Sequence, residues 1–135
     1  MADAVTSQTI QDDDRLAVMK FTNVSDGTGE SAVKKVDVSA LVTNSRGETC
    51  TGVYVSKIWW ATVGMGVKIE FDASTNVLLI GLPADSTGDE YYSDSFTAIP
   101  NNAGGGKTGD IDFTTIGHSS GDTYSIIFEL IKKYG

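Results

Sequence analysis

The sequence is poor in the residues that support several common kinds of site. It contains one cysteine, Cys50, and one histidine, His118, among 135 residues. An intrachain disulfide is therefore impossible, and a metal site built from several histidines is excluded. No window approaches the run of about 20 apolar residues that a membrane span requires.

Positive charge is also scarce. Ten Lys and Arg residues stand against eighteen Asp and Glu residues, which gives a formal net charge of −8. Nucleic acids and anionic membrane surfaces attract clusters of basic residues, so this balance argues against both as partners. The first residues show no basic segment followed by an apolar run. We therefore expect no secretory signal and folding in a cytoplasm.

Helical periodicity is missing as well, whereas period-2 alternation of apolar and polar residues recurs along the chain. An alternating strand, a polar turn and an all-apolar strand follow one another over residues 66–82. This pattern predicts a β-hairpin in which Phe71 pairs with Val77 and Ile69 pairs with Leu79. We expect the rest of the chain to close over this hairpin.

Further strands are expected throughout, separated by loops rich in Gly, Asp, Ser and Asn. The predicted fold class is all-β: a single-domain antiparallel β-sandwich or compact β-barrel with long polar loops. We assign the β domain to residues 13–135. Residues 1–12 are polar and rich in Thr and Ser, and we interpret them as an N-terminal arm, either a peripheral strand or a flexible segment. Val5 and Ile10 are the residues of this arm that a partner would bury.

Two stretches resemble catalytic or nucleotide-binding motifs only in part. Residues 104–108 (GGGKT) resemble the end of a phosphate-binding loop, but Asn101 stands where that motif needs glycine, and a strand follows instead of a helix. Residues 118–122 contain the His, Ser and Asp of a hydrolase triad, yet neighbours in one tight turn rarely supply triad geometry. We expect no enzyme, no catalytic residues and no cofactor.

Carboxylates gather in three loops, and each group is a candidate Ca²⁺ site. None has the twelve-residue spacing of an EF-hand. We therefore interpret them as solvated acidic loops and expect no metal site. The three groups are Asp12 to Asp14, Asp26 with Glu30, and Asp85 with Asp89 and Glu90.

Two adjacent tryptophans, Trp59 and Trp60, lie in the longest predicted strand, residues 51–63. Neighbouring strand residues point to opposite faces, so the two cannot share one core. Trp59 alternates with three valines and an alanine, which predicts that it lies in the core. Trp60 shares its face with Tyr54 and Ile58, and this face is either covered by a second layer or meets a partner, where Trp is enriched. Tyr54, Ile58 and Trp60 are therefore interface candidates.

Several stretches resemble small structural proteins of tailed bacteriophages, most closely capsid decoration (cement) proteins. They are residues 6–12 (TSQTIQD), 18–31 (VMKFTNVSDGTGES), 63–66 (VGMG) and 117–126 (GHSSGDTYSI). The resemblance covers nearly the whole chain. It implies a virion protein, assembled in the host cytoplasm, that binds the major capsid protein and stabilises the shell by bridging its subunits. It also implies a homo-oligomer, with a trimer favoured, and it brings no catalytic motif.

Two other functions stay open on the sequence. A phage tail or adsorption-apparatus protein would also be an all-β assembly component, and it would bind glycan through Tyr91, Tyr92 or the exposed tryptophan. A small hydrolase is the third class, but the chain offers only one histidine, in a predicted turn, for a catalytic triad.

Overall fold

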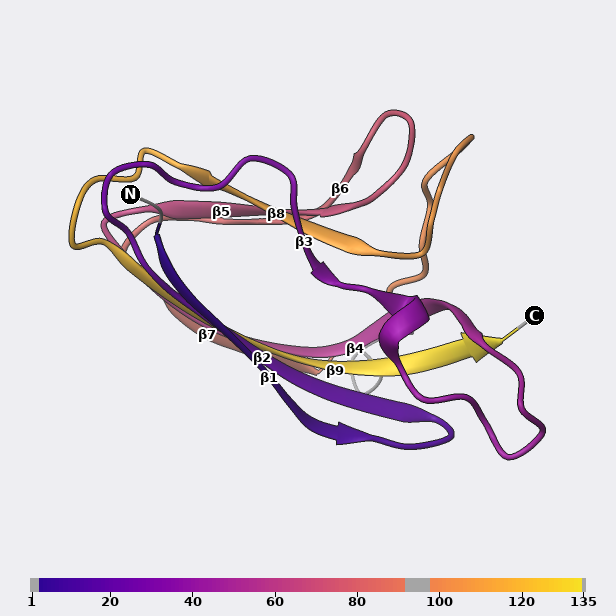
Figure 1. The fold of residues 1–135 in the computed structure, drawn as a ribbon. Coiled ribbons are helices and arrows are strands. Elements are labelled where there is room, and N and C mark those ends of the chain that lie inside the picture. The colour runs from indigo at the N-terminus through magenta and orange to yellow at the C-terminus, as the bar shows by residue number, and fades with distance from the viewer. Residues whose placement is uncertain (1–2, 92–97, 135) are drawn as a thin grey trace.

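The computed structural model describes residues 3–91 and 98–134, which form two stacked antiparallel β-sheets (Figure 1). The prediction of an all-β sandwich is confirmed. Within the described residues, no helix is long and apolar enough to cross a membrane. In chain order the elements are β1 (Ala4–Asp12), β2 (Leu16–Val24), β3 (Val33–Val36), the short 3₁₀ helix η1 (Val38–Ala40), β4 (Cys50–Val63), β5 (Gly66–Phe71), β6 (Val77–Leu82), β7 (Thr87–Tyr91), β8 (Ile111–Ile116) and β9 (Thr123–Tyr134).

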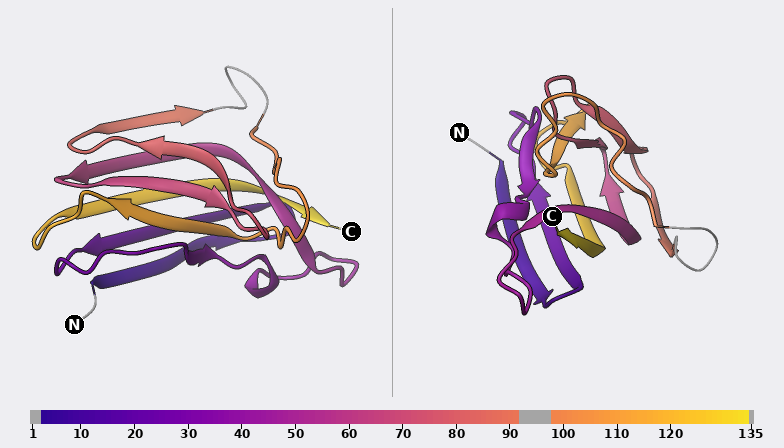
Figure 2. Two further views of the ribbon diagram at one scale, coloured as in Figure 1. Left: turned by 90° about the horizontal axis from the view of Figure 1, so that it is seen from above. Right: turned by 90° about the vertical axis from the view of Figure 1, so that its right-hand side faces the viewer.

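Strands from distant parts of the chain lie side by side in both sheets. The five-stranded sheet has the order β1-β2-β9-β4-β7, and the four-stranded sheet has the order β3-β8-β5-β6. The last strand, β9, is thus held between β2 and β4, the two strands with which it forms long antiparallel ladders. The strand axes of the two sheets are roughly aligned (Figure 2), as in an aligned sandwich.

The core is made by the inward faces of the two sheets. β2 and β9 alternate buried and less buried side chains without interruption, as their sequences predict. Four aromatic rings meet between the sheets: Phe113 of β8 lies 5.4 Å from Phe21, 6.0 Å from Phe128 and 5.7 Å from Tyr124, measured between ring centroids. The rings meet edge to face, the geometry that their quadrupoles favour.

The hairpin β5–β6 forms, but part of its predicted register is wrong. Phe71 pairs with Val77 as expected, whereas Ile69 pairs with Ile80 instead of Leu79. A β-bulge between Ile69 and Glu70 inserts one extra residue into β6 and shifts the remaining pairs by one. β6 is also an edge strand rather than a strand covered on both faces, and Leu78 is 52% exposed.

The predicted N-terminal arm, residues 1–12, contains the edge strand β1. β1 pairs with β2 from Ala4 to Asp12, with one bulge between Thr9 and Gln11. Of the two possibilities left open by the sequence, the structure has the peripheral strand. Side chains from Ala4 to Gln11 are exposed, so this strand adds backbone hydrogen bonds and little apolar burial.

A second bulge changes the face to which the side chains of β4 point. Val55 pairs with Leu130 and Lys57 pairs with Glu129, which leaves Ser56 as the extra residue. Both Val55 and Ser56 are buried. Val53 and Val55 therefore face the core before this bulge, and the even-numbered residues Ile58 and Thr62 face it afterwards.

Candidate functional site

The residues that resemble a hydrolase triad lie in the turn between β8 and β9. The Ser119 backbone N–H donates to Asp122 Oδ2 at 2.7 Å, as in an ordinary turn. His118 Nδ1 lies 3.1 Å from Thr115 Oγ1. The histidine thus contacts a threonine of β8, and these side chains do not form a nucleophile–base–acid chain.

The glycine-rich stretch at residues 104–108 is a loop that packs against the end of β5. Thr108 Oγ1 donates to Asp72 Oδ2 at 2.8 Å, and the Thr108 backbone N–H donates to the Asp72 carbonyl at 3.2 Å. Strand β8 follows, as predicted, in place of the helix that a phosphate-binding loop requires.

Two carboxylates that we expected in solvated loops are in fact paired with buried lysines: Glu30 is buried and Asp12 is partly buried. Asp12 bonds Lys132, whose side chain is fully buried, and Glu30 bonds Lys35, whose side chain is 4% exposed. Asp85 accepts a hydrogen bond from the Gly64 backbone N–H at 2.8 Å. Among the described residues, no group of three or more acidic, His or Cys side chains is arranged to hold a metal ion.

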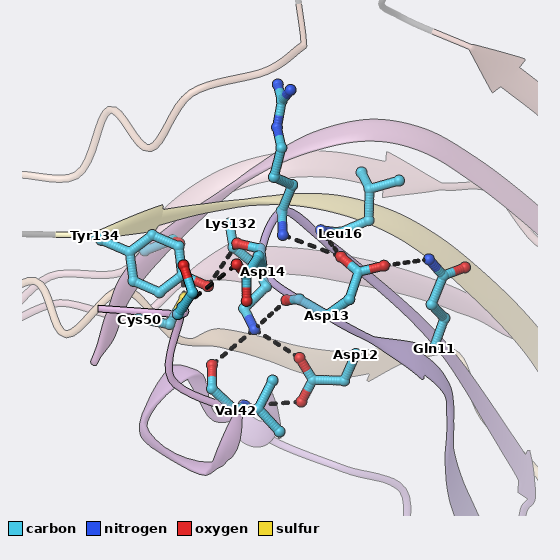
Figure 3. A network of polar contacts seen from close by, with 12 residues as sticks. Gln11, Asp12, Asp13, Asp14, Leu16, Val42, Cys50, Lys132 and Tyr134 are labelled. Atoms are coloured by element: carbon cyan, nitrogen blue, oxygen red, sulfur yellow. Dashed lines mark hydrogen bonds and ion pairs between the residues drawn. The ribbon is translucent and has the colours of Figure 1, made fainter. Parts of the chain in front are cut away.

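Lys132 fastens the N-terminal strand to the end of β9 (Figure 3). Its Nζ donates to Asp12 Oδ1 and to the Asp13 carbonyl, both at 2.7 Å, and to the Val42 carbonyl at 2.8 Å. Three acceptors satisfy the three donors of the ammonium group. Burial lowers the pKa of Lys132, but the hydrogen bond to Asp12 and the proximity of Tyr134 outweigh this effect and raise the pKa overall. This network is structural.

A second buried network surrounds Glu30. Tyr124 Oη donates to Glu30 Oε1 at 2.6 Å, Asn23 Nδ2 donates to the same oxygen at 3.0 Å, and Lys35 Nζ lies 2.5 Å from Oε2. Burial, followed by the contact with Glu30, raises the pKa of Tyr124 far above its ordinary value. The network joins the loop after β2 to strands β2, β3 and β9 and leaves no reactive group open to a substrate.

The assignment of the two tryptophans to faces is wrong, because the bulge at Ser56 reverses the alternation. Trp59 is 40% exposed on the outer face of the five-stranded sheet. Trp60 is partly buried and packs against the core, and its indole N–H donates to Ser86 Oγ at 3.0 Å. Ile58, which we expected at an interface, is completely buried.

The other predicted interface residues lie on two separate parts of the molecule. Val5 and Ile10 are 46% and 54% exposed on β1. Tyr54 is partly buried and pairs with Ile131 near the other end of the five-stranded sheet. The described residues do not include Tyr92, and of Tyr91 only the backbone is described, so the predicted glycan contacts lie outside this description.

Trp59 belongs to an apolar surface that sequence reasoning missed. In the ladder it pairs with Ile127 of β9. A shallow depression on this surface is lined by Val18, Lys57, Trp59, Ile127 and Glu129. We call these five residues, together with Leu16 and Ile131 from the next cross-strand row, the apolar face.

The outer side of the four-stranded sheet differs in character. Asp112 pairs with Glu70 across β8 and β5, and Asp72 and Asp110 lie at the neighbouring position. Burial, followed by the proximity of Asp72, raises the pKa of Asp112 to about 6. We call Asp72, Asp110 and Asp112 the carboxylate cluster.

Comparisons with known proteins add little. No protein-family model and no curated protein matches the sequence. The chain is similar to the crystal structure of a cupin superfamily protein from Desulfitobacterium hafniense DCB-2, with 13% identity and a TM-score of 0.24. That match covers 98% of this chain and 77% of the other. A likeness this low assigns neither a family nor an activity.

Proposed function

We propose that this chain is a structural protein of a bacteriophage virion, namely a head decoration (cement) protein that binds the major capsid protein and stabilises the shell. The observation that carries the proposal is the apolar face, where Trp59 is 40% exposed on the outer side of the five-stranded sheet. The sequence resemblance to phage decoration proteins supports the same function. The proposed partner is a protein, not nucleic acid or a membrane, in keeping with the net charge of −8.

The apolar face has the composition of a protein-binding surface. Trp59 and Ile127 lie side by side in one cross-strand row, and Val18, Glu129 and Lys57 form the next row. An exposed Trp is a typical anchor of a protein interface, and aromatic anchors contribute much of the binding energy there. Covering the anchor removes apolar area from water, which stabilises a complex by roughly 25 cal/mol per Å².

The edge strand β1 offers a second contact. Between Ala4 and Gln11 it carries neither charge nor proline, the usual protections of an exposed edge. Val5 and Ile10 project from this strand and are exposed. In the proposed complex β1 adds to a strand of the capsid protein or of a second copy. A homo-oligomer, with a trimer favoured, belongs to the proposal.

A binding experiment tests this function directly. Purified protein is mixed with expanded phage heads that lack it, and the bound fraction is measured by sedimentation. We expect saturable binding and heads that resist heating better. Trp59→Ala should weaken binding by about 30-fold or more, since a central Trp contributes 2 kcal/mol or more.

Leu78→Ala is the matched control, because Leu78 is an exposed apolar residue on the other sheet, 52% exposed against 40% for Trp59. It should bind heads as the unchanged protein does. If Trp59→Ala binds heads as well as Leu78→Ala does, the apolar face is not the binding surface.

The exposed tryptophan also favours a second candidate, a tail or adsorption protein that stacks Trp59 on a sugar ring. Immunogold electron microscopy of virions separates the two functions. Label over the head shell supports decoration, and label confined to the tail supports the second candidate.

A further inference from the structure

The carboxylate cluster forms where the ends of two strands meet. Asp72 directly follows β5, and Asp110 directly precedes β8. Because Phe71 pairs with Ile111, the two aspartates stand opposite each other, and the Asp72 backbone N–H donates to the Asp110 carbonyl at 3.0 Å. The fold thus concentrates negative charge at one place on the outer side of the four-stranded sheet.

Asp112 is the anomalous member of this cluster. It is only 3% exposed. Its Oδ2 accepts a hydrogen bond from Asn76 Nδ2 at 3.2 Å, but its Oδ1 is buried without a hydrogen-bond partner. Such an oxygen is costly, because burial removes water and nothing replaces it. A buried carboxylate oxygen without a donor from the protein needs a proton or a cation as its partner.

The charges near Asp112 do not balance. Lys34 Nζ lies 3.0 Å from Asp110 Oδ2, so this ammonium is paired with Asp110. The three carboxylates of the cluster beside one ammonium leave two negative charges, and Glu70, which pairs with Asp112 across the strands, adds a third. Asp72, whose Oδ2 accepts a bond from Thr108, lies within hydrogen-bonding reach of Asp112. Two carboxylates at such a distance repel each other unless a proton or a cation lies between them.

We propose that Asp72 and Asp112 together bind a divalent metal ion, Ca²⁺ or Mg²⁺. Both ions prefer oxygen ligands, and Mg²⁺ in particular is often held by only one or two carboxylates with water completing the shell. The Thr108 hydroxyl and the Asn76 amide are the neutral groups already bonded to these two carboxylates.

The bound ion would join two segments of the chain directly and hold a third through its contacts with the first. It would fasten the turn after β5, through Asp72, to β8, through Asp112. The loop of residues 104–108 is held to the same turn by Thr108 and by the bond from Ser74 N to the Gly105 carbonyl, at 3.2 Å. The ion should therefore stabilise the folded chain, since a ligand that binds only the folded state raises its stability.

Thermal unfolding of the full chain at pH 8 tests the site. The Tm is compared in EDTA and in increasing CaCl₂ or MgCl₂ at constant ionic strength. We expect a saturable rise of at least about 3 °C with one of the two ions. Isothermal titration calorimetry should give one ion per chain.

Asp112→Asn and Asp72→Asn should each abolish the rise, and Asp112→Asn should be at least as stable as the unchanged protein in EDTA, because the amide removes the repulsion. Glu48→Gln changes the charge equally at an exposed loop position outside the carboxylate cluster and should keep the full response. Two results would overturn the proposal. One is an unchanged Tm with both ions, and the other is a response that survives both aspartate variants.

Discussion

The two outer faces of this sandwich carry opposite chemistry. The five-stranded sheet presents the apolar face, which includes Trp59 and Ile127. The four-stranded sheet carries acidic side chains on its outer side, namely Glu70 and the carboxylate cluster, of which Asp110 and Asp112 are buried. A protein partner gains by covering the first surface, whereas the second must be neutralised by protons, cations or water. Interaction with a protein is therefore expected through one sheet only.

Both faces lie on the same folded sandwich, so the first prediction concerns its stability. It removes the buried ammonium group of Lys132 that holds Asp12. Lys132→Met leaves Asp12 without its buried ammonium partner. Removing one partner of a buried ion pair typically costs about 3–5 kcal/mol. We expect the free energy of unfolding, measured in urea, to fall by that amount.

Lys133→Met is the control for this change, because the neighbouring lysine is exposed. It should alter stability by no more than about 0.5 kcal/mol. A similar loss from both variants would mean that charge, rather than the buried network, explains the effect.

The second prediction separates the inner and outer sides of β4. Trp60→Ala removes a ring that packs against the core and bonds Ser86, and it should cost about 2–4 kcal/mol of stability. Trp59→Ala removes a ring from the surface and should cost less than about 1 kcal/mol. Urea unfolding of the two variants measures the difference. If Trp59→Ala costs more stability than Trp60→Ala, the face assignment expected from simple alternation is correct.

The third prediction concerns the acidic side and has the smallest expected effect. Burial and the nearby Asp72 raise the pKa of Asp112 to about 6 in the folded chain, above the ordinary value of an aspartate. Between the unfolded and folded pKa values, the folded state binds a proton that the unfolded state has lost. Stability from this group therefore increases as the pH falls through about 6 and is lost above it.

The corresponding measurement is the Tm in metal-free buffer at about pH 7.5 and about pH 5.5. The unchanged protein should gain more stability on acidification than Asp112→Asn, in which the titrating group is absent. Identical pH dependence in the two proteins would contradict the assigned environment of Asp112.

The sequence predicts the regular strands well and the irregular ones badly. β2 and β9 keep strict alternation from end to end, so their inward residues, such as Phe21 and Phe128, could be identified. β6 contains one bulge and β4 contains two, and one extra residue moves every later side chain to the other face. In β4 the only warning was Lys57, a charged residue within an otherwise apolar series.

The buried polar networks could not be predicted for a different reason. Lys132 continues the inward series of β9, which was a usable sign that its ammonium is buried. Its partner Asp12, however, lies 120 residues away in the sequence. Only the folded sheet brings the two together, and the same holds for Asp72 and Asp112.

The most direct test of the central claim is whether a partner covers Trp59. Trp60→Phe leaves Trp59 as the only tryptophan of the chain. Replacing it biosynthetically with 5-hydroxytryptophan allows its emission to be excited apart from the capsid's own tryptophans. Quenching by acrylamide is then measured for the free protein and for the protein bound to phage heads. If a partner covers the apolar face, acrylamide quenching of Trp59 should fall several-fold on binding. Unchanged quenching in the bound protein would contradict this account.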